Sequence, residues 1–118
     1  MLTFRIRFQF LPARFDEAAG ALRSLAGPVR SQPGCLATSL LQDLNDPHTL
    51  VYVEEWRDLE HFERHLLTVW FRTVVAVMEL AADSPTVAID DVASRRGFEL
   101  VEEVLGVAPF ETQNHETA

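Results

Sequence analysis

The chain has 118 residues and a formal net charge of −8, and 47% of its residues are hydrophobic and 24% charged. This length and composition are typical of one globular domain, and the apolar runs are far shorter than the roughly 20 residues that span a bilayer. Because the net negative charge would repel a phosphate backbone and Arg5 and Arg7 stand where a secretory signal would be apolar, we expect a cytoplasmic protein that binds neither nucleic acid nor membrane.

The N-terminal segment predicts a strand followed by a helix. Leu2–Phe10 alternates apolar and polar side chains, which indicates a half-buried strand, and Pro12 ends it. Ala13–Leu25 carries apolar side chains on one side at helical spacing. We expect this helix to end at Gly27-Pro28, because glycine and proline are typical of helix C-termini.

A hairpin follows the turn at 32–34. Strands are expected over Leu36–Gln42 and Leu50–Trp56, and the turn cluster Asn45-Asp46-Pro47 lies between them. The first of these strands is apolar on both alternations: Leu36 and Leu40 share one parity, and Ala37 and Leu41 share the other. Both faces of the predicted sheet therefore require cover.

Two helices and a last strand complete the predicted core. Asp58 is a suitable N-cap for the first of these helices. The inward-facing residues that we expect in the first helix are Leu59, Phe62 and Leu66, and those in the second are Phe71, Val74, Val75, Met78 and Ala82. A bend is expected at 68–70, and Thr86–Val92 predicts the last strand.

The expected order is therefore βαββαβ within residues 1–93. Right-handed crossovers then give an α+β, ferredoxin-like fold, which has an antiparallel four-stranded sheet with both helices on one face. A second copy is the simplest cover for the other face, so we expect a homodimer. Residues 94–118 form a C-terminal extension that we expect to be frayed at its end; within it, Phe98–Leu105 fits a helix slightly better than a strand.

The composition excludes several kinds of catalytic chemistry. Cys35 is the only cysteine, which rules out an internal disulfide and a multi-thiolate zinc site. All ten basic residues are arginines, so no lysine is present to form a Schiff base or to bind phosphate in a P-loop. His61 and His65 are four residues apart on a predicted helix, but no third metal ligand is evident, and we predict no metal site.

The strand that ends at Trp56 predicts a pocket. Side chains of Tyr52, Glu54 and Trp56 project from one face because strand side chains alternate with period two. For Glu54, the commoner role is a cross-strand ion pair with Arg5 or Arg7, and acid–base chemistry is the alternative.

Three segments, PGCLATSLLQD, VYVEEWRDLEHFERHL and FRTVVAVMEL, resemble the antibiotic-biosynthesis monooxygenase superfamily, which includes quinol monooxygenases. The resemblance covers about Leu2 to Val92 and implies a dimeric α+β barrel with a pocket between the sheet and the helices. Trp56 matches the strand-end tryptophan of the family, and His65 matches a helix histidine of many quinol-oxygenase-like members. The chain departs from relatives that carry an asparagine in place of Tyr52 or a second histidine in place of Trp70.

This resemblance implies a cofactor-independent monooxygenase that oxidises a quinol or polyphenol with dioxygen. In such chemistry the protein supplies a base, a dry site and an orientation, because a deprotonated quinol can reduce dioxygen itself. His65 is the candidate base and Glu54 the alternative, and we expect Tyr52, Trp56, Phe62 and Trp70 to line the substrate pocket. Two other functions remain open: a non-catalytic protein that binds a small aromatic ligand, and an oxygen-independent isomerase or cyclase.

Overall fold

Four strands and five helices make up residues 1–106, the part of the chain described by the structure, which is a computed structural model. In chain order the elements are β1 (Leu2–Gln9), α1 (Pro12–Arg23), α2 (Ala26–Arg30), β2 (Cys35–Gln42), β3 (Thr49–Trp56), α3 (Leu59–Leu66), α4 (Val69–Leu80), β4 (Thr86–Asp91) and α5 (Phe98–Leu105). The expectation of a frayed C-terminal end concerns the residues after Pro109, which lie outside the described residues.

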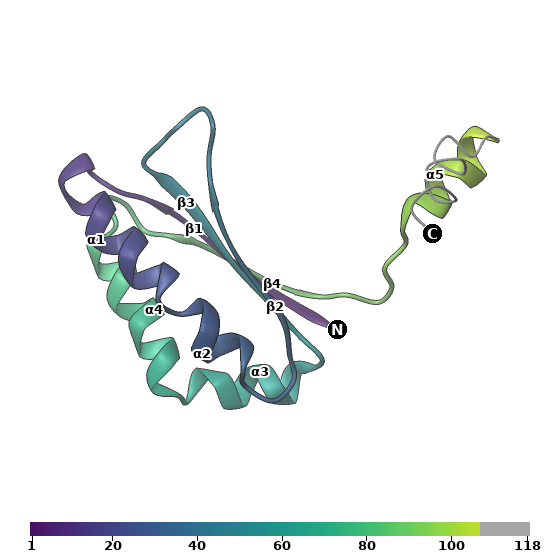
Figure 1. Cartoon of the computed structure of the whole chain (residues 1–118), viewed down its shortest axis with the longest axis horizontal. Helices are drawn as coiled ribbons and strands as arrows, with labels where there is room; N and C mark the ends of the chain where they lie inside the picture. Colours follow the sequence, from purple (N-terminus) through teal and green to yellow (C-terminus); the bar gives the residue numbers. More distant parts are fainter. Residues whose placement is uncertain (107–118) are drawn as a thin grey trace.

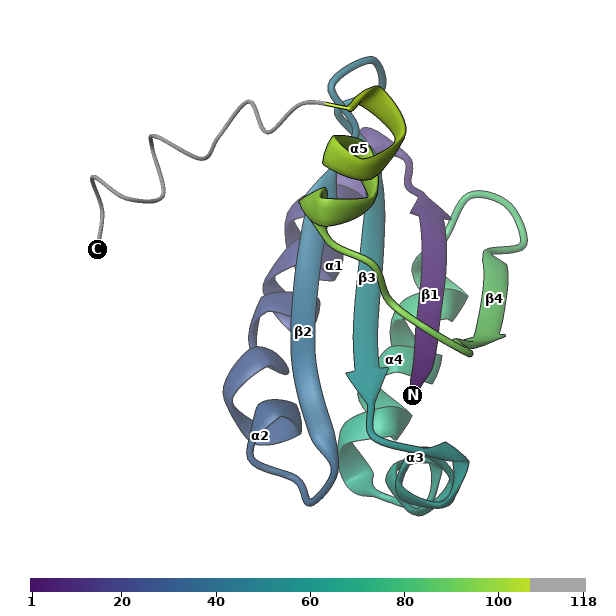
Figure 2. The same ribbon diagram turned by 90° about the vertical axis from the view of Figure 1, so that its right-hand side faces the viewer.

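The strands form one antiparallel sheet in the order β2-β3-β1-β4. This is the strand order of the ferredoxin-like α+β fold, so the predicted fold class is confirmed. Helices α1 to α4 all cover the same face of the sheet (Figure 1). Within residues 1–106, no helix packs against the opposite face, and α5 projects on that side (Figures 1 and 2).

The core lies between the sheet and the helix layer. The even-numbered residues of β1 from Leu2 to Phe8 are at most 3% exposed, whereas their odd-numbered neighbours face the uncovered side. The helices contribute Ala18, Ala19 and Leu22 from α1 and Val74 and Val77 from α4. Burying each of the larger of these side chains contributes about 1.5–3 kcal/mol, so the alternation predicted from the sequence is the main source of stability.

Two local features differ from the sequence prediction. Gly27-Pro28 does not end the helical region, because both residues lie inside the short helix α2. Proline is tolerated there since the first turn of a helix has no acceptor for its missing N–H. In β2, a β-bulge lies between Cys35 and Ala37, so Leu36 does not share a face with Leu40 as expected and is 52% exposed.

The predicted turn and cap residues have the expected roles. Asp46 accepts hydrogen bonds from the His48 backbone N–H at 3.2 Å and the Thr49 hydroxyl at 2.7 Å, which fixes the β2–β3 hairpin. Asp58 caps α3 by accepting from the His61 N–H at 3.0 Å. The interpretation of Phe98–Leu105 as a helix is also confirmed, with Gly106 in the left-handed region at its C-terminus. Among residues 1–106, no helix is both long and apolar enough to cross a membrane.

Gly34, in the turn before β2, provides a test of this fold. Its φ is +82°, and a Cβ built there would lie 2.5 Å from the His61 Cβ. We expect Gly34→Ala to lower the free energy of unfolding by about 2 kcal/mol or more, from backbone strain and the clash together. Urea denaturation followed by tryptophan fluorescence measures this change.

Gly20→Ala is the matched control. A Cβ at Gly20, inside α1, meets no atom within 4 Å. Because alanine is the better helix former, this change should raise stability by about 0.5–1 kcal/mol. Equal stability of Gly34→Ala and the wild-type chain would show that the turn does not have this geometry.

Candidate functional site

Three polar and aromatic side chains of β3 face the helix layer. Tyr52, Glu54 and Trp56 are each at most 1% exposed and alternate with outward-facing residues, as the strand period predicts. A buried carboxylate is costly unless donors satisfy it. The Tyr52 hydroxyl donates to Glu54 Oε2 at 2.6 Å, and Trp56 Nε1 donates to Oε1 at 3.0 Å. The two neighbours on the same strand face thus bind both carboxylate oxygens.

His65 completes this group from α3. The Asp58 cap starts the helix, and Phe62 and His65, one turn apart, are its buried residues. His65 Nε2 lies 2.9 Å from Glu54 Oε2. The imidazole stacks on Trp56, with ring centroids 4.7 Å apart, and meets the edge of Phe71 at 5.7 Å. Its exposure is 1%, so His65 neither faces water nor rims an open cavity.

Gln32 is a member of this group that the sequence analysis did not identify. Its Oε1 lies 3.1 Å from His65 Nδ1. The Gln32 Nε2 atom is buried and has no hydrogen-bond partner among the described residues. No sequence signal marks Gln32 beyond its place in a turn, because the contact joins residues 33 positions apart. Its amide therefore gives Nδ1 a partner and leaves one hydrogen-bonding atom beside the imidazole unused.

The expected ion pair between Glu54 and Arg5 or Arg7 is wrong. In the β1–β3 register Glu54 lies opposite Phe4, and directly opposed residues point to the same face of a sheet. Arg5 and Arg7 have the other parity and project from the uncovered face. There they pair with Asp90 and Asp43, each at 3.6 Å.

The two other predicted pocket residues lie in different surroundings. Phe62 is buried, with its ring centroid 6.4 Å from that of Trp56 and 5.4 Å from that of Phe4. Trp70, near the start of α4, is 38% exposed, and within residues 1–106 it makes none of the ring contacts that surround His65. The structure therefore brings Phe62 next to the buried group and leaves Trp70 apart from it.

His61 and His65 do not face a common metal site. His61 Nδ1 lies 2.7 Å from Asp58 Oδ1 at the start of α3, whereas His65 is directed at Glu54. Within residues 1–106, no group of three or more histidine, cysteine, aspartate or glutamate side chains is arranged to hold a metal ion.

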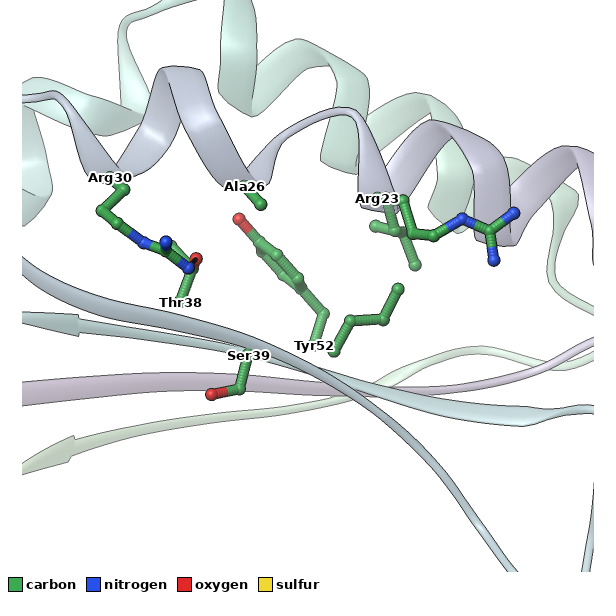
Figure 3. A pocket seen from close by; sticks show the side chains of 8 residues that line it. Arg23, Ala26, Arg30, Thr38, Ser39 and Tyr52 are labelled. Atoms are coloured by element: carbon green, nitrogen blue, oxygen red, sulfur yellow. Dashed lines mark hydrogen bonds between the residues drawn. The ribbon is translucent and has the colours of Figure 1, made fainter.

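Two openings adjoin the buried group. The larger is an apolar groove of about 440 Å³ between α3, α4, β1 and β4, which we call the aromatic groove. Its lining residues are Phe4, Phe62, Leu66, Phe71, Val75, Met78, Val87 and Ile89. A smaller opening of about 170 Å³ lies between β2 and helices α1 and α2. Figure 3 shows the Tyr52 ring in this opening, below Ala26, with Arg30 extended toward Thr38.

The sequence suggested a hollow edged by Trp56 and His65, and the structure corrects this. Their own rings fill the space, since Trp56 is 0% and His65 1% exposed. Phe62 and Phe71 contact these two rings on one side and line the aromatic groove on the other. A ligand in the groove is therefore one aromatic ring away from the imidazole.

Burial and the nearby carboxylate change the acidity of two groups. Burial, followed by the charge of Glu54 and the hydrogen bond to it, strongly raises the pKa of Tyr52, which makes Tyr52 a hydrogen-bond donor rather than a base. Burial and then the Glu54 charge also raise the pKa of Cys35, which keeps its thiol protonated.

Comparison with known proteins agrees with this fold. The family model described as "Antibiotic biosynthesis monooxygenase" matches residues 1–77. A crystal structure of an antibiotic biosynthesis monooxygenase is 29% identical, with a TM-score of 0.71 over 80% of this chain and 100% of that one. PA3566 from Pseudomonas aeruginosa is 28% identical, with a TM-score of 0.69 over 79% of this chain and 94% of that one. Rv0793 from Mycobacterium tuberculosis, 18% identical, shares the fold with a TM-score of 0.74 over 81% and 98% of the two chains.

The chain is also 27% identical over 64 residues to sll1783, an uncharacterized protein of Synechocystis sp.. That match covers 54% of this chain and 44% of the relative, so the chain spans less than half of the length of this curated relative. Fold and site together define a ferredoxin-like protein with a monooxygenase-like scaffold. The chain belongs to the antibiotic biosynthesis monooxygenase family.

Tyr52 is the only tyrosine, so tyrosinate absorbance reports on this residue alone. Because the pKa of Tyr52 is raised above the unfolded value of about 10, the native protein should show no tyrosinate signal at pH 11, whereas the urea-unfolded chain should titrate near pH about 10. The protonated Tyr52 phenol makes its full contribution to the free energy of unfolding below pH ~10, the unfolded pKa. This contribution is lost as the pH rises from there through the raised pKa of the folded state.

Tyr52→Phe is the control for this titration and should abolish the signal in both states. A native titration near pH about 10 in an otherwise folded wild-type protein would mean that the Tyr52 hydroxyl is not enclosed with Glu54.

Proposed function

We propose that this protein is a cofactor-independent monooxygenase that oxidises an electron-rich phenol or quinol with dioxygen. The single observation that carries the proposal is the buried Glu54–His65 pair, at 2.9 Å, beside a groove lined by aromatic and aliphatic side chains. Membership of the antibiotic biosynthesis monooxygenase family supports the same reaction class.

The aromatic groove is the proposed substrate site. Its volume of about 440 Å³ lies in the range of small-molecule pockets. The rings of Phe4, Phe62 and Phe71 offer faces and edges for an aromatic ligand.

Proton removal is the step that we assign to His65. Glu54 occupies Nε2, so the nitrogen that can accept the substrate proton is Nδ1, and the Gln32 amide must move aside for it to do so. Glu54 would then stabilise the imidazolium, as a carboxylate does in other histidine-base sites. The phenolate gives one electron to dioxygen, and the resulting radical and superoxide combine. Their new ring C–O bond gives a peroxide, and the imidazolium returns its proton to the outer peroxide oxygen. The O–O bond then breaks as the ring carbon loses its hydrogen, so that overall the phenol and O₂ give a quinone and water, with no external reductant.

Access to His65 requires a side-chain movement. Phe71 separates the groove from the imidazole, and it is only partly buried in the first turn of α4. Rotation of this ring is the smallest change that would join the groove to the buried group.

We also propose a homodimer whose sheets face each other. The uncovered face carries apolar side chains, among them Val51 opposite Leu41 and Val53 opposite Ser39. Leu41 is 55% exposed, and an open sheet face with such residues is stabilised by a second layer.

The second candidate function is a protein that binds an aromatic ligand without turnover. The observation that favours it is the packing around His65, because the groove can take a ligand while both imidazole nitrogens keep their protein partners. The two candidates differ in whether oxygen is consumed.

His65→Ala tests the assigned base. We expect oxygen uptake with a panel of quinols and polyphenols, measured without added flavin or metal, to fall roughly 10²–10⁴-fold in kcat, the usual contribution of a positioned general base. Product formation is followed in parallel with and without oxygen, and co-purified small molecules are identified by mass spectrometry.

His48→Ala is the control, because His48 lies at the β2–β3 hairpin against Phe15, with ring centroids 5.4 Å apart, and makes no hydrogen bond or ring contact with Glu54 or His65. This variant should keep the wild-type rate of oxygen uptake.

Undiminished oxygen uptake in a folded His65→Ala protein would show that His65 is not the base. Tight binding without turnover would support the second candidate, and equal product yield without oxygen would support an isomerase or cyclase.

Val75→Trp tests the groove separately from the base. Val75 lines the groove and is 42% exposed, so an indole there fills the groove without disturbing buried side chains. We expect kcat/KM to fall at least about tenfold, with an unchanged Tyr52 titration. Val69→Trp on the same helix, 56% exposed and not part of the groove lining, should leave kcat/KM unchanged.

A further inference from the structure

Helix α5 has an apolar surface that no other element of residues 1–106 covers. Leu100, Val101, Val104 and Leu105 form two neighbouring ridges at helical spacing and are between 40% and 76% exposed. None of the residues of α5 is buried. Scattered exposed apolar residues are ordinary, but an apolar stripe along a whole helix marks a surface that packs against something.

Local hydrogen bonds and an ion pair stabilise the ends of α5. The Glu99 carboxylate accepts from the Gly97 N–H at 2.9 Å, Arg96 binds Glu103 at 3.0 Å, and the Gly106 N–H donates to the Glu102 carbonyl at 2.9 Å. These bonds explain where the helix begins and ends. A helix of eight residues is nevertheless too short to be stable in water without packing, because isolated helices need about 12–15 residues.

The segment before α5 leads away from the domain on the uncovered side of the sheet (Figures 1 and 2). Arg95 binds Glu55, which lies on that face opposite Ala37, so the middle of the segment is fixed to the uncovered face. The radius of gyration is 17.4 Å, compared with about 13 Å for a compact chain of this length. The difference agrees with a helix held outside its own domain.

A second copy is the partner that fits this placement. Facing sheets pack about 10 Å apart, and residues 95–97 can extend about 10 Å from the Arg95–Glu55 contact, so α5 reaches the sheet of a facing copy. We propose that residues 92–105 form an exchanged arm, in which the apolar stripe of α5 packs on the second copy of the homodimer. This inference rests on the proposed dimer and adds a second contact region to it.

Val101→Asp/Leu105→Asp tests the arm. Dimer dissociation constants are measured by analytical ultracentrifugation, and hydrogen exchange of the α5 amides is measured over a range of protein concentrations. We expect the double variant to raise the dissociation constant at least about tenfold. In the wild-type protein, α5 should be protected at concentrations at which it is dimeric and lose that protection on dilution. Since α5 contributes nothing to the core, the Tyr52 titration of the variant should be unchanged.

Leu59→Asp/Leu67→Asp is the matched control, because both leucines are exposed, at 55% and 83%, near the helices on the other side of the sheet. It should change the dissociation constant less than about twofold. Two results would contradict the exchanged arm without contradicting the dimer. One is free exchange of the α5 amides in the wild-type dimer, and the other is an unchanged dissociation constant in the double variant. Protection that persists in the monomer would also overturn the arm, since α5 would then fold back on its own chain. A wild-type protein that is monomeric at every concentration would overturn both proposals.

Discussion

The buried carboxylate of Glu54 is the constraint on which the rest of the site depends. A carboxylate without water needs donors on both oxygens, and here they come from three different positions: Tyr52 and Trp56 on the same strand, and His65 on α3. The strand period brings the first two to Glu54 without any tertiary requirement. His65 reaches Glu54 only because α3 packs over the end of β3. The hydrogen bond between these two side chains therefore joins α3 to the sheet. Leaving such a group without a partner costs about 1–3 kcal/mol, which makes this contact as important to the fold as a large apolar side chain.

The same arrangement explains why the site is closed. Stacking of His65 on Trp56 and edge contact with Phe71 surround the imidazole with aromatic rings, and this packing keeps water away from the carboxylate. A dry base is useful for making a phenolate, but only if substrate can reach it. Stability and access therefore make opposite demands on the ring of Phe71, which packs on the base and also lines the groove where an aromatic ligand would lie.

The fold could be predicted from the sequence because its determinants are local. Alternation over β1, the turn at Asp46 and the cap at Asp58 each depend on neighbouring residues, and all three have the expected roles. The face of Glu54 was predicted as well, but its partners were not: a cross-strand pair with arginine requires matching parity, and parity between β1 and β3 is set by a register that the sequence does not reveal. Gln32 was missed for a related reason, since a turn residue and a helix residue 33 positions apart meet only after the turn before β2 and α3 have packed together. The β-bulge beside Leu36 likewise depends on the neighbouring strand.

The close approach of Gly34 to His61 has a consequence for how the imidazole could become accessible. The Gly34 carbonyl accepts from the Arg57 N–H at 2.8 Å, so this turn is bound to the end of β3 as well as being pressed against the first turn of α3. Gln32 belongs to the same turn, so its backbone cannot swing away as an independent flap and only its side-chain amide can rotate. Entry of a ligand from the side of this turn would require partial unfolding of α3. Entry past Phe71 requires only a change in the rotamer of that one side chain. The buried base therefore has two possible entry routes with different barriers, a low one past the Phe71 ring and a high one through the turn that contains Gln32.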